Sequence, residues 1–241
     1  FKNFTSVYAE LCKEICEKIK HDLFKFFLLK NCRVYFQRNP LLKSIEIVNE
    51  IRNEKDLAEK NAKKLANELK NAKRDNMEAL ELKTLILKAK NANDKVEDEK
   101  YKLDEEIQKL NYNKKLYVNH IIFIGELFKA SVIKCKIINE CIEILFQDPE
   151  DWKIECICNL LTTVGENFEK MQKVILNPKE LLELYISNLE EIKQNKLCSS
   201  RIRFMILDLL ELRARNWKLK SSEHLPKKIN EIRKDFKIAE L

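Results

Sequence analysis

Glycine and proline are scarce in this sequence, with 2 glycines and 4 prolines among 241 residues. A β-sandwich or barrel needs a turn roughly every 8–12 residues, and a doubly wound α/β fold needs glycine-rich loops after its strands. Two glycines cannot supply those turns, so composition predicts an all-α protein. The same scarcity excludes the glycine-rich nucleotide loops GxGxxG and GxxxxGK[ST] and the GxSxG elbow of serine hydrolases.

Clusters of metal-binding or catalytic residues are also lacking. The chain has 3 histidines and 8 cysteines, with no Cys-x-x-Cys pair and no histidines at ligand spacing. We therefore expect no metal site and no cofactor, and we interpret the cysteines as reduced core residues of a cytoplasmic protein. His120 lies on an apolar helix face and is expected to be a core residue. No acid–base pair or triad is evident, so we expect no enzyme activity.

Long apolar runs are absent as well, whereas charge is abundant. No stretch of 18 apolar residues exists, so no membrane span is predicted. Charged residues make up 35% of the chain and the net charge is +7, and residues 191–241 hold 13 basic against 7 acidic residues. Such a basic end predicts an anionic partner such as RNA, although a solvated surface explains it equally well. The candidate RNA-binding residues are Lys218, Lys220, Lys227, Lys228, Arg233 and Lys234.

Three regions follow one another along the chain. Residues 1–44 begin with two amphipathic helices over the first 38 residues, which Asn39-Pro40 ends. Residues 45–115 are highly charged, with 30 charged residues among the 61 from 50 to 110, and their large apolar residues keep no sustained heptad. This region is interpreted as a protruding charged helix or helical hairpin. A partner-binding coiled coil and a disordered loop remain alternatives.

Residues 116–241 return to densely apolar helices of ordinary length. We predict helices over Tyr117–Phe128 and Lys134–Phe146, a third that begins at Asp148-Pro149 and ends at Gly165, and a fourth over Asn167–Ile175. Further starts are predicted at Asn177-Pro178 and Ser199-Ser200, and a short basic helix after Pro226. Short links between these helices are typical of stacked antiparallel helix pairs.

Several segments in this last region are similar to one family. They are Phe123–Lys129, Leu160–Gly165, Ser199–Met205, Leu209–Arg213 with Asn216-Trp217, and Pro226–Arg233. In this order they resemble the middle domain of eukaryotic translation initiation factor 4 gamma and of its close paralogue, the death-associated homologue. The resemblance covers about 117–236 and extends weakly to 4–38. It says nothing about residues 45–115, and it suggests that the chain begins inside the domain.

The resemblance implies both a fold and a function. The fold is a HEAT-like α-α superhelix of stacked antiparallel helix pairs, here with the long charged helical insertion. The function is a scaffold, without catalysis, that binds and activates the DEAD-box RNA helicase of initiation (factor 4A). The scaffold also binds RNA and, in some members, the multisubunit initiation factor 3. We expect a monomer. Alternatives are an RNA-binding helical module without helicase activation, or a coiled-coil adaptor acting through residues 45–115.

Five residues are candidates for contact with the helicase: Glu126, Lys129, Arg201, Arg203 and Trp217. Glu126 and Lys129 lie opposite the apolar face of their helix. Arg201 and Arg203 flank the inward Ile202, so they cannot share one helix face, and one of them is expected to pair internally with a carboxylate such as Asp208 or Glu211. Trp217 follows basic residues and is either an interface anchor or packed against the last helix.

Overall fold

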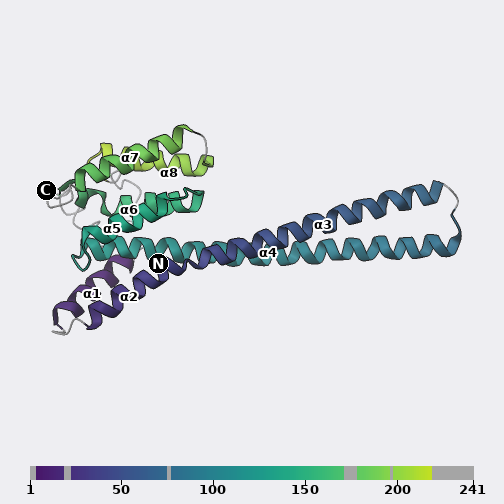
Figure 1. Ribbon diagram of the computed structural model, residues 1–241, viewed down its shortest axis with the longest axis horizontal. Coiled ribbons are helices and arrows are strands. Elements are labelled where there is room, and N and C mark those ends of the chain that lie inside the picture. The colour runs from purple at the N-terminus through teal and green to yellow at the C-terminus, as the bar shows by residue number, and fades with distance from the viewer. Residues whose placement is uncertain (1–3, 19–22, 75–76, 171–177, 196–197, 219–241) are drawn as a thin grey trace, which may run out of the picture. The chain divides into compact units, whose positions relative to one another are not determined.

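Helices make up the fold, and no strand occurs in the residues that the structure, a computed structural model, describes: 4–18, 23–74, 77–170, 178–195 and 198–218. The chain divides into two compact units, residues 1–144 and 145–241. The helices are α1 (Thr5–Lys18), α2 (Leu23–Arg38), α3 (Pro40–Arg74), α4 (Ala79–Lys129), α5 (Cys135–Phe146), α6 (Asp151–Lys170), α7 (Pro178–Gln194) and α8 (Ser200–Ala214) (Figure 1). The prediction of an all-α, HEAT-like fold is confirmed. None of the described helices combines the length and apolar character that a membrane-spanning segment requires.

In the first unit, the last third of α4 is the central element against which α1 and α2 pack. Its buried side chains include Ile121, Ile124 and Leu127. The buried Tyr117 hydroxyl donates a hydrogen bond of 3.2 Å to the carbonyl oxygen of Phe36 at the end of α2. Together these contacts fix α2 against α4.

The chain turns from α2 into α3 at Asn39. This residue has a φ of 33°, in the left-handed region that asparagine tolerates better than most residues. Its side-chain oxygen accepts a hydrogen bond of 3.2 Å from the backbone N–H of Leu41, which otherwise would have no partner in the first turn of α3. The break expected at Asn39-Pro40 is thus present, and a new helix begins directly at Pro40.

The charged region forms a long antiparallel hairpin of α3 and α4, which lie side by side (Figure 1). The less exposed residues of both helices recur at alternating spacings of three and four, which is the heptad of a coiled coil. On α3 this seam consists of Leu41, Ser44, Val48, Ile51, Lys55, Ala58, Ala62, Leu65, Leu69 and Ala72. On α4 it consists of Leu82, Leu85, Ala89, Ala92, Val96, Glu99, Leu103, Glu106, Leu110, Asn113 and Tyr117.

The expectation of no sustained heptad was therefore wrong. It rested on large apolar residues, whereas alanines fill several seam positions and polar residues fill others. Several leucines outside the seam, such as Leu57, Leu80 and Leu87, are exposed instead. Of the three interpretations that the sequence left open, the described residues of this region have the helical hairpin, and its role as an insertion stays a prediction.

Glu99 is the most unusual residue of the seam. Its side chain is 7% exposed, and its Oε1 accepts a hydrogen bond of 2.9 Å from Lys102. Its buried Oε2 has no hydrogen-bond partner within the described part of the chain. A half-satisfied carboxylate in an apolar seam lowers stability relative to an apolar residue of similar size.

The second unit packs α6 against α7 and α8. Its core is formed by the fully buried Ile157, Leu160, Leu161, Val164, Phe168, Leu182, Leu189, Ile202 and Ile206. The spacing of these residues at three and four positions places them on one face of each helix, as the amphipathic pattern of the sequence predicts.

Several predicted helix boundaries need correction. Tyr117–Phe128 is not a separate helix, because α4 continues without a break through residue 115 to Lys129. α6 begins at Asp151 instead of Pro149 and runs through Gly165 to Lys170, so Gly165 does not end a helix. The expected helix over Asn167–Ile175 therefore begins inside α6, and its remainder lies outside the described residues. The starts at Pro178 and Ser199 are confirmed.

Candidate functional site

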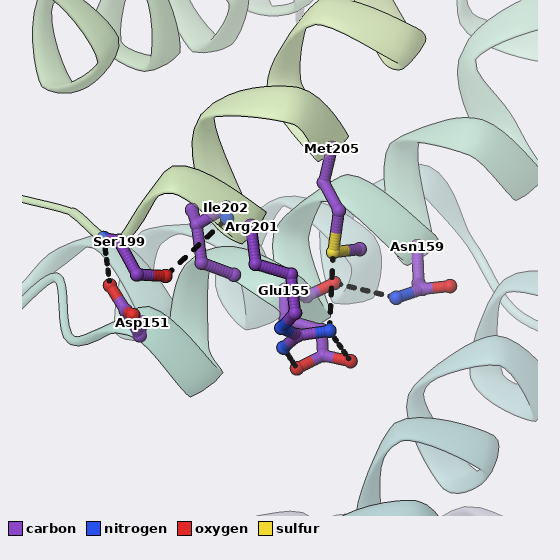
Figure 2. A network of polar contacts seen from close by, with 7 residues as sticks. All are labelled: Asp151, Glu155, Asn159, Ser199, Arg201, Ile202 and Met205. Carbon is purple, nitrogen blue, oxygen red and sulfur yellow. Dashed lines mark hydrogen bonds and ion pairs between the residues drawn. The ribbon is translucent and has the colours of Figure 1, made fainter.

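Helix α8 carries three of the five helicase-contact candidates on it or directly after it, and its start is fixed by two polar contacts. Ser199 is the N-cap, and its hydroxyl accepts a hydrogen bond from the N–H of Ile202 at 3.5 Å. The N–H of Ser199 donates to Asp151 at the beginning of α6, at 3.2 Å (Figure 2). The N-terminal ends of α8 and α6 are therefore held together.

Arg201 is held by a carboxylate of α6. Both terminal nitrogens of its guanidinium donate to Glu155, one of them at 3.3 Å, in a two-pronged ion pair (Figure 2). This hydrogen bonding raises the pKa of Arg201 above its ordinary value, so the residue stays charged. The sequence predicted an internal carboxylate partner for one of the two arginines, but the partner is Glu155 of α6 and not Asp208 or Glu211.

The other arginine, Arg203, lies on a different face of α8 from Arg201. Its guanidinium donates to the hydroxyl of Ser200 at 2.8 Å, one turn earlier on the same helix. Beside it in sequence, Phe204 is 66% exposed, and Leu207, one turn further, is also exposed. An arginine next to exposed aromatic and aliphatic side chains is the composition that anchors protein interfaces.

Sequence reasoning did not single out Phe204 or Leu207. The signal was available, because the buried Ile202, Ile206 and Leu209 define the inner face of α8 and leave Phe204 and Leu207 outside it. We call Arg203, Phe204 and Leu207 the outer face of α8.

Arg213, near the end of α8, joins three helices. Its Nε donates to Glu169 of α6 at 2.8 Å, and its Nη1 donates to Glu183 of α7 at 3.0 Å. Hydrogen bonding to these carboxylates, Glu183 foremost, raises the pKa of Arg213. This arginine therefore serves the packing of the second unit.

Trp217 follows α8 and packs against α6. Its indole N–H donates to Glu169 at 2.8 Å, so Glu169 binds both Arg213 and Trp217. The indole ring lies directly over Gly165. Asn216 and Trp217 have φ values of 53° and 60°, the left-handed conformation that turns the chain back toward α6. The sequence offered packing against the last helix as one interpretation, whereas the ring packs against α6. Contact with a partner stays a prediction.

A groove of about 470 Å³ is lined by side chains of both α6 and α8, on the side of Met205. Its walls include Thr162 of α6 and Asp208 and Glu211 of α8, together with Arg215 and Lys218 after α8. Most of the lining is nevertheless apolar, with Cys158, Met205 and Leu209 contributing beside these charged residues.

The remaining helicase candidates, Glu126 and Lys129, lie at the C-terminal end of α4 in the first unit. They form an ion pair with each other, with Lys129 Nζ 3.2 Å from Glu126 Oε1. Lys129 is exposed and Glu126 is half-buried. The sequence placed both outside the apolar face, whereas the Glu126 side chain is only 15% exposed. Their pairing was not anticipated, and contact with the helicase stays a prediction.

Of the candidate RNA-binding residues, Lys218 is described and exposed. Lys220, Lys227, Lys228, Arg233 and Lys234 lie outside the described residues, as does the short helix expected after Pro226. Their role therefore stays a prediction.

Histidine and cysteine form no metal site in the part of the chain that the structure describes. All eight cysteines are free thiols, and burial raises the pKa of Cys141 and Cys158 to about 12. His120 is largely buried: its Nε2 lies 3.1 Å from the carbonyl oxygen of Cys32, and its ring centroid lies 4.5 Å from that of Tyr35. Burial lowers the pKa of His120, which fits the expectation of a core histidine.

Comparison with known proteins places these observations in context. The MIF4G domain family matches residues 2–216. Eukaryotic translation initiation factor 4 gamma 3 of Mus musculus is 34% identical over 146 residues, which is 59% of this chain and 9% of that protein. Eukaryotic translation initiation factor 4 gamma of Schizosaccharomyces pombe is 38% identical over 117 residues, 47% of this chain and 8% of that protein. The match thus spans less than a tenth of the length of either relative.

Proposed function

Because the chain belongs to the MIF4G domain family, we propose that it is a scaffold domain of translation initiation that binds and activates the DEAD-box RNA helicase factor 4A and binds RNA. The names of the relatives as initiation factors support the process. The observation that carries the helicase contact is the outer face of α8, where Arg203 lies next to the highly exposed Phe204.

The pairing of the other arginines strengthens this assignment. Arg201 is occupied by Glu155, and Arg213 by Glu169 and Glu183, so both hold α8 in place. Arg203 makes only a neutral contact with Ser200 among the bonds described. Arg203 is half-buried beside the exposed Phe204. A side chain that a rigid helix already holds in place loses little conformational entropy when it binds a partner.

Activation requires a second contact. A scaffold shifts a two-state helicase only by the difference in its affinity for the two states. Contacts from two compact units provide such a difference when each unit binds one helicase lobe. Glu126 and Lys129 at the end of α4 are our candidates in the first unit, and Arg201, Arg203 and Trp217 with the outer face of α8 are those in the second.

RNA binding belongs to the basic end of the chain in this proposal. Lys218, Lys220, Lys227, Lys228, Arg233 and Lys234 would contact phosphates without reading sequence. We further propose a cytoplasmic protein that lacks catalytic activity of its own and acts as a monomer. A contact with the multisubunit initiation factor 3 is part of the same family-based proposal, without an assigned surface.

The coiled-coil adaptor is the weaker alternative. In the hairpin, the seam of α3 is covered by α4 of the same chain, so neither helix presents a free heptad seam to a second chain. An RNA-binding module without helicase activation remains the second candidate, and the basic end favours it.

The test measures capture of recombinant factor 4A and stimulation of its ATPase at saturating scaffold. We expect Arg203→Glu combined with Phe204→Ala to weaken capture by about tenfold to a hundredfold, since interface anchors contribute about 2 kcal/mol or more. The matched control is Leu184→Ala, which removes an exposed apolar side chain from α7. Full ATPase stimulation by wild-type chain, lost in the double variant, supports the proposal. No capture by the wild-type chain, with RNA binding intact, favours the RNA-binding module instead.

A further inference from the structure

Charge is segregated along the hairpin of α3 and α4. Residues 60–90, which we call the basic tip, contain 9 lysines and arginines against 4 acidic residues. The rest of the hairpin, 41–59 together with 91–116, contains 9 basic against 12 acidic residues. The arm is therefore positive at its far end and slightly negative near its base.

The basic side chains of α3 form a line on the side away from α4. Ala62, Leu65, Leu69 and Ala72 face the seam, so positions 60, 63, 67, 70 and 74 lie on the opposite side of the helix. These positions hold Lys60, Lys63, Asn67, Lys70 and Arg74. At about 1.5 Å per residue the line is about 21 Å long, with a hydrogen-bond donor at each helical turn.

Few carboxylates neutralise this line. Near the base, ion pairs such as Lys55 with Glu59 at 2.7 Å and Lys109 with Glu106 at 2.8 Å are short. In the tip, Lys63 lies 3.9 Å from its nearest partner. Among the described residues, no ion pair joins a carboxylate to Lys60, Lys70, Arg74, Lys83 or Lys90. The charge of the tip is consequently available to an external anion.

We propose that the basic tip binds the phosphate backbone of RNA without reading its sequence. A straight row of cations along two helical turns or more matches a linear, uniformly charged backbone. Residues 60–90 contain no aromatic residue, so bases have no ring on which to stack, and contacts are confined to phosphate and sugar. This inference rests on the RNA-binding part of the proposed function and adds a second contact, far in sequence from the basic end.

RNA fits this surface better than a lipid bilayer or an acidic protein. A helix embedded in a bilayer surface and the centre of a stable protein interface both use apolar side chains beside the charges. Between residues 60 and 74, the large apolar residues of α3 all lie in the seam. The exposed large apolar residues of the tip are Met77 before α4 and Leu80, Ile86 and Leu87 on α4, none of them on α3. The basic line on α3 therefore offers charge without exposed large apolar side chains.

The experiment compares two fourfold variants of the full chain that remove equal charge. The tip variant carries Lys60→Gln, Lys63→Gln, Lys70→Gln and Arg74→Gln. The base variant carries Lys43→Gln, Arg52→Gln, Lys100→Gln and Lys115→Gln. Fluorescence anisotropy with a labelled 20-nucleotide oligouridylate and a 20-base-pair RNA duplex gives affinity from 50 to 200 mM KCl. Circular dichroism checks that both variants keep their helices.

We expect the tip variant to bind RNA roughly tens of times more weakly than wild type at 50 mM KCl. The slope of log affinity against log salt concentration should fall by about 3, because each lost phosphate contact with a single strand removes about 0.7. The base variant is expected to stay within about threefold of wild type. Equal affinities of the tip variant and wild type, or equal losses in the two variants, would overturn the proposal. So would preferential binding of the tip to phosphatidylserine vesicles over both RNAs.

Capture of factor 4A by the same variants separates this inference from the proposed function. The tip variant is expected to capture the helicase as wild type does. Loss of RNA binding in the tip variant with normal helicase capture supports the inference. Unchanged RNA binding refutes it and leaves the helicase scaffold untouched.

Discussion

The indole ring of Trp217 occupies the space in which a side chain at Gly165 would lie. A Cβ atom at Gly165 would be 2.0 Å from Cη2 of Trp217 and 2.4 Å from two further ring carbons. Glycine at this position of α6 is thus required by close packing and not by backbone conformation, since the residue lies inside a continuous helix. The pair joins the segment after α8 to the middle of α6.

This packing predicts that Gly165→Ala changes the free energy of unfolding in opposite directions in the presence and in the absence of Trp217. Gly165→Ala in the wild-type chain is expected to lower the free energy of unfolding by about 1–3 kcal/mol, because the methyl group displaces the ring. The same substitution in a Trp217→Ala background is expected to raise it by about 0.5–1 kcal/mol, because alanine favours a helix interior over glycine. Urea denaturation of the four chains measures both values.

Trp217→Phe is the control that keeps an aromatic ring and loses the hydrogen bond to Glu169. Gly165→Ala should remain destabilising in that chain. If Gly165→Ala costs the same with and without Trp217, the ring does not rest on Gly165 in solution.

The long hairpin shows how far the sequence alone could lead. Scarce glycine and proline and the dense charge indicated helices, and these helices are present. The coiled-coil seam was missed because Ala58, Ala62 and Ala89 carry too little apolar surface to stand out in a pattern of leucines. The continuation of α4 into the core was missed because composition changes near residue 115 while the helix does not end there.

The site was predicted in part, for similar reasons. The Ser199 cap and the divergent directions of Arg201 and Arg203 follow from local rules of helix geometry. The pairing of Arg201 with Glu155 joins residues 46 positions apart, which no local pattern reveals. The packing of Trp217 on Gly165 depends equally on tertiary structure, and glycine in the sequence indicated a helix end instead.

Glu99 provides a test of the coiled-coil seam. Its carboxylate is buried and only one of its oxygens has a partner in the described structure. Glu99→Leu is expected to raise the free energy of unfolding by about 1–2 kcal/mol, because it removes the desolvation cost and adds apolar contact opposite α3. Thermal unfolding followed by circular dichroism measures the change.

Glu97→Leu is the matched control, because Glu97 is exposed on the same helix. It should change stability by less than about 0.5 kcal/mol. A destabilising Glu99→Leu would mean that the carboxylate is better satisfied than the seam geometry indicates. The oligomeric state of both variants should be measured by sedimentation, because a more apolar seam favours pairing between the helices of two chains.

His120 makes the stability of the first unit depend on pH. Burial lowers its pKa in the folded chain below the ordinary value of 6.5. The unfolded chain therefore takes up a proton first as pH falls. Stability contributed by neutral His120 is fully present above pH 6.5 and is lost as pH falls through 6.5 toward the lower folded pKa.

His120→Gln is expected to flatten this dependence, because glutamine keeps a donor for the Cys32 carbonyl and does not titrate in this range. Urea denaturation at pH 7.5, 6.5 and 5.5 compares the two chains. The carboxylates titrate mostly below this window and affect both chains alike. An equal fall in stability for both chains would assign the dependence to another group.

The far part of the hairpin is expected to be dispensable for folding. The side chains of Asn113 and Ser44 pair at 2.9 Å across the base of the hairpin, and one heptad beyond them lie Glu106 and Ile51. Replacing residues 52–105 with a four-residue Gly-Ser-Gly-Asn turn keeps this heptad in register. The removed segment has a seam rich in alanine and many exposed ion pairs, each worth under about 1 kcal/mol. Closing a much shorter loop also offsets part of the loss in stability.

We therefore expect the shortened chain to stay folded, with the contact of Tyr117 with Phe36 intact. Its capture of the helicase should remain within about twofold of the full chain, while its RNA affinity falls as in the tip variant. A shortened chain that unfolds would show that the arm contributes to the stability of the first unit. Lost helicase capture in a folded shortened chain would place part of that contact on the arm. Circular dichroism, capture and anisotropy on the same preparation distinguish these outcomes.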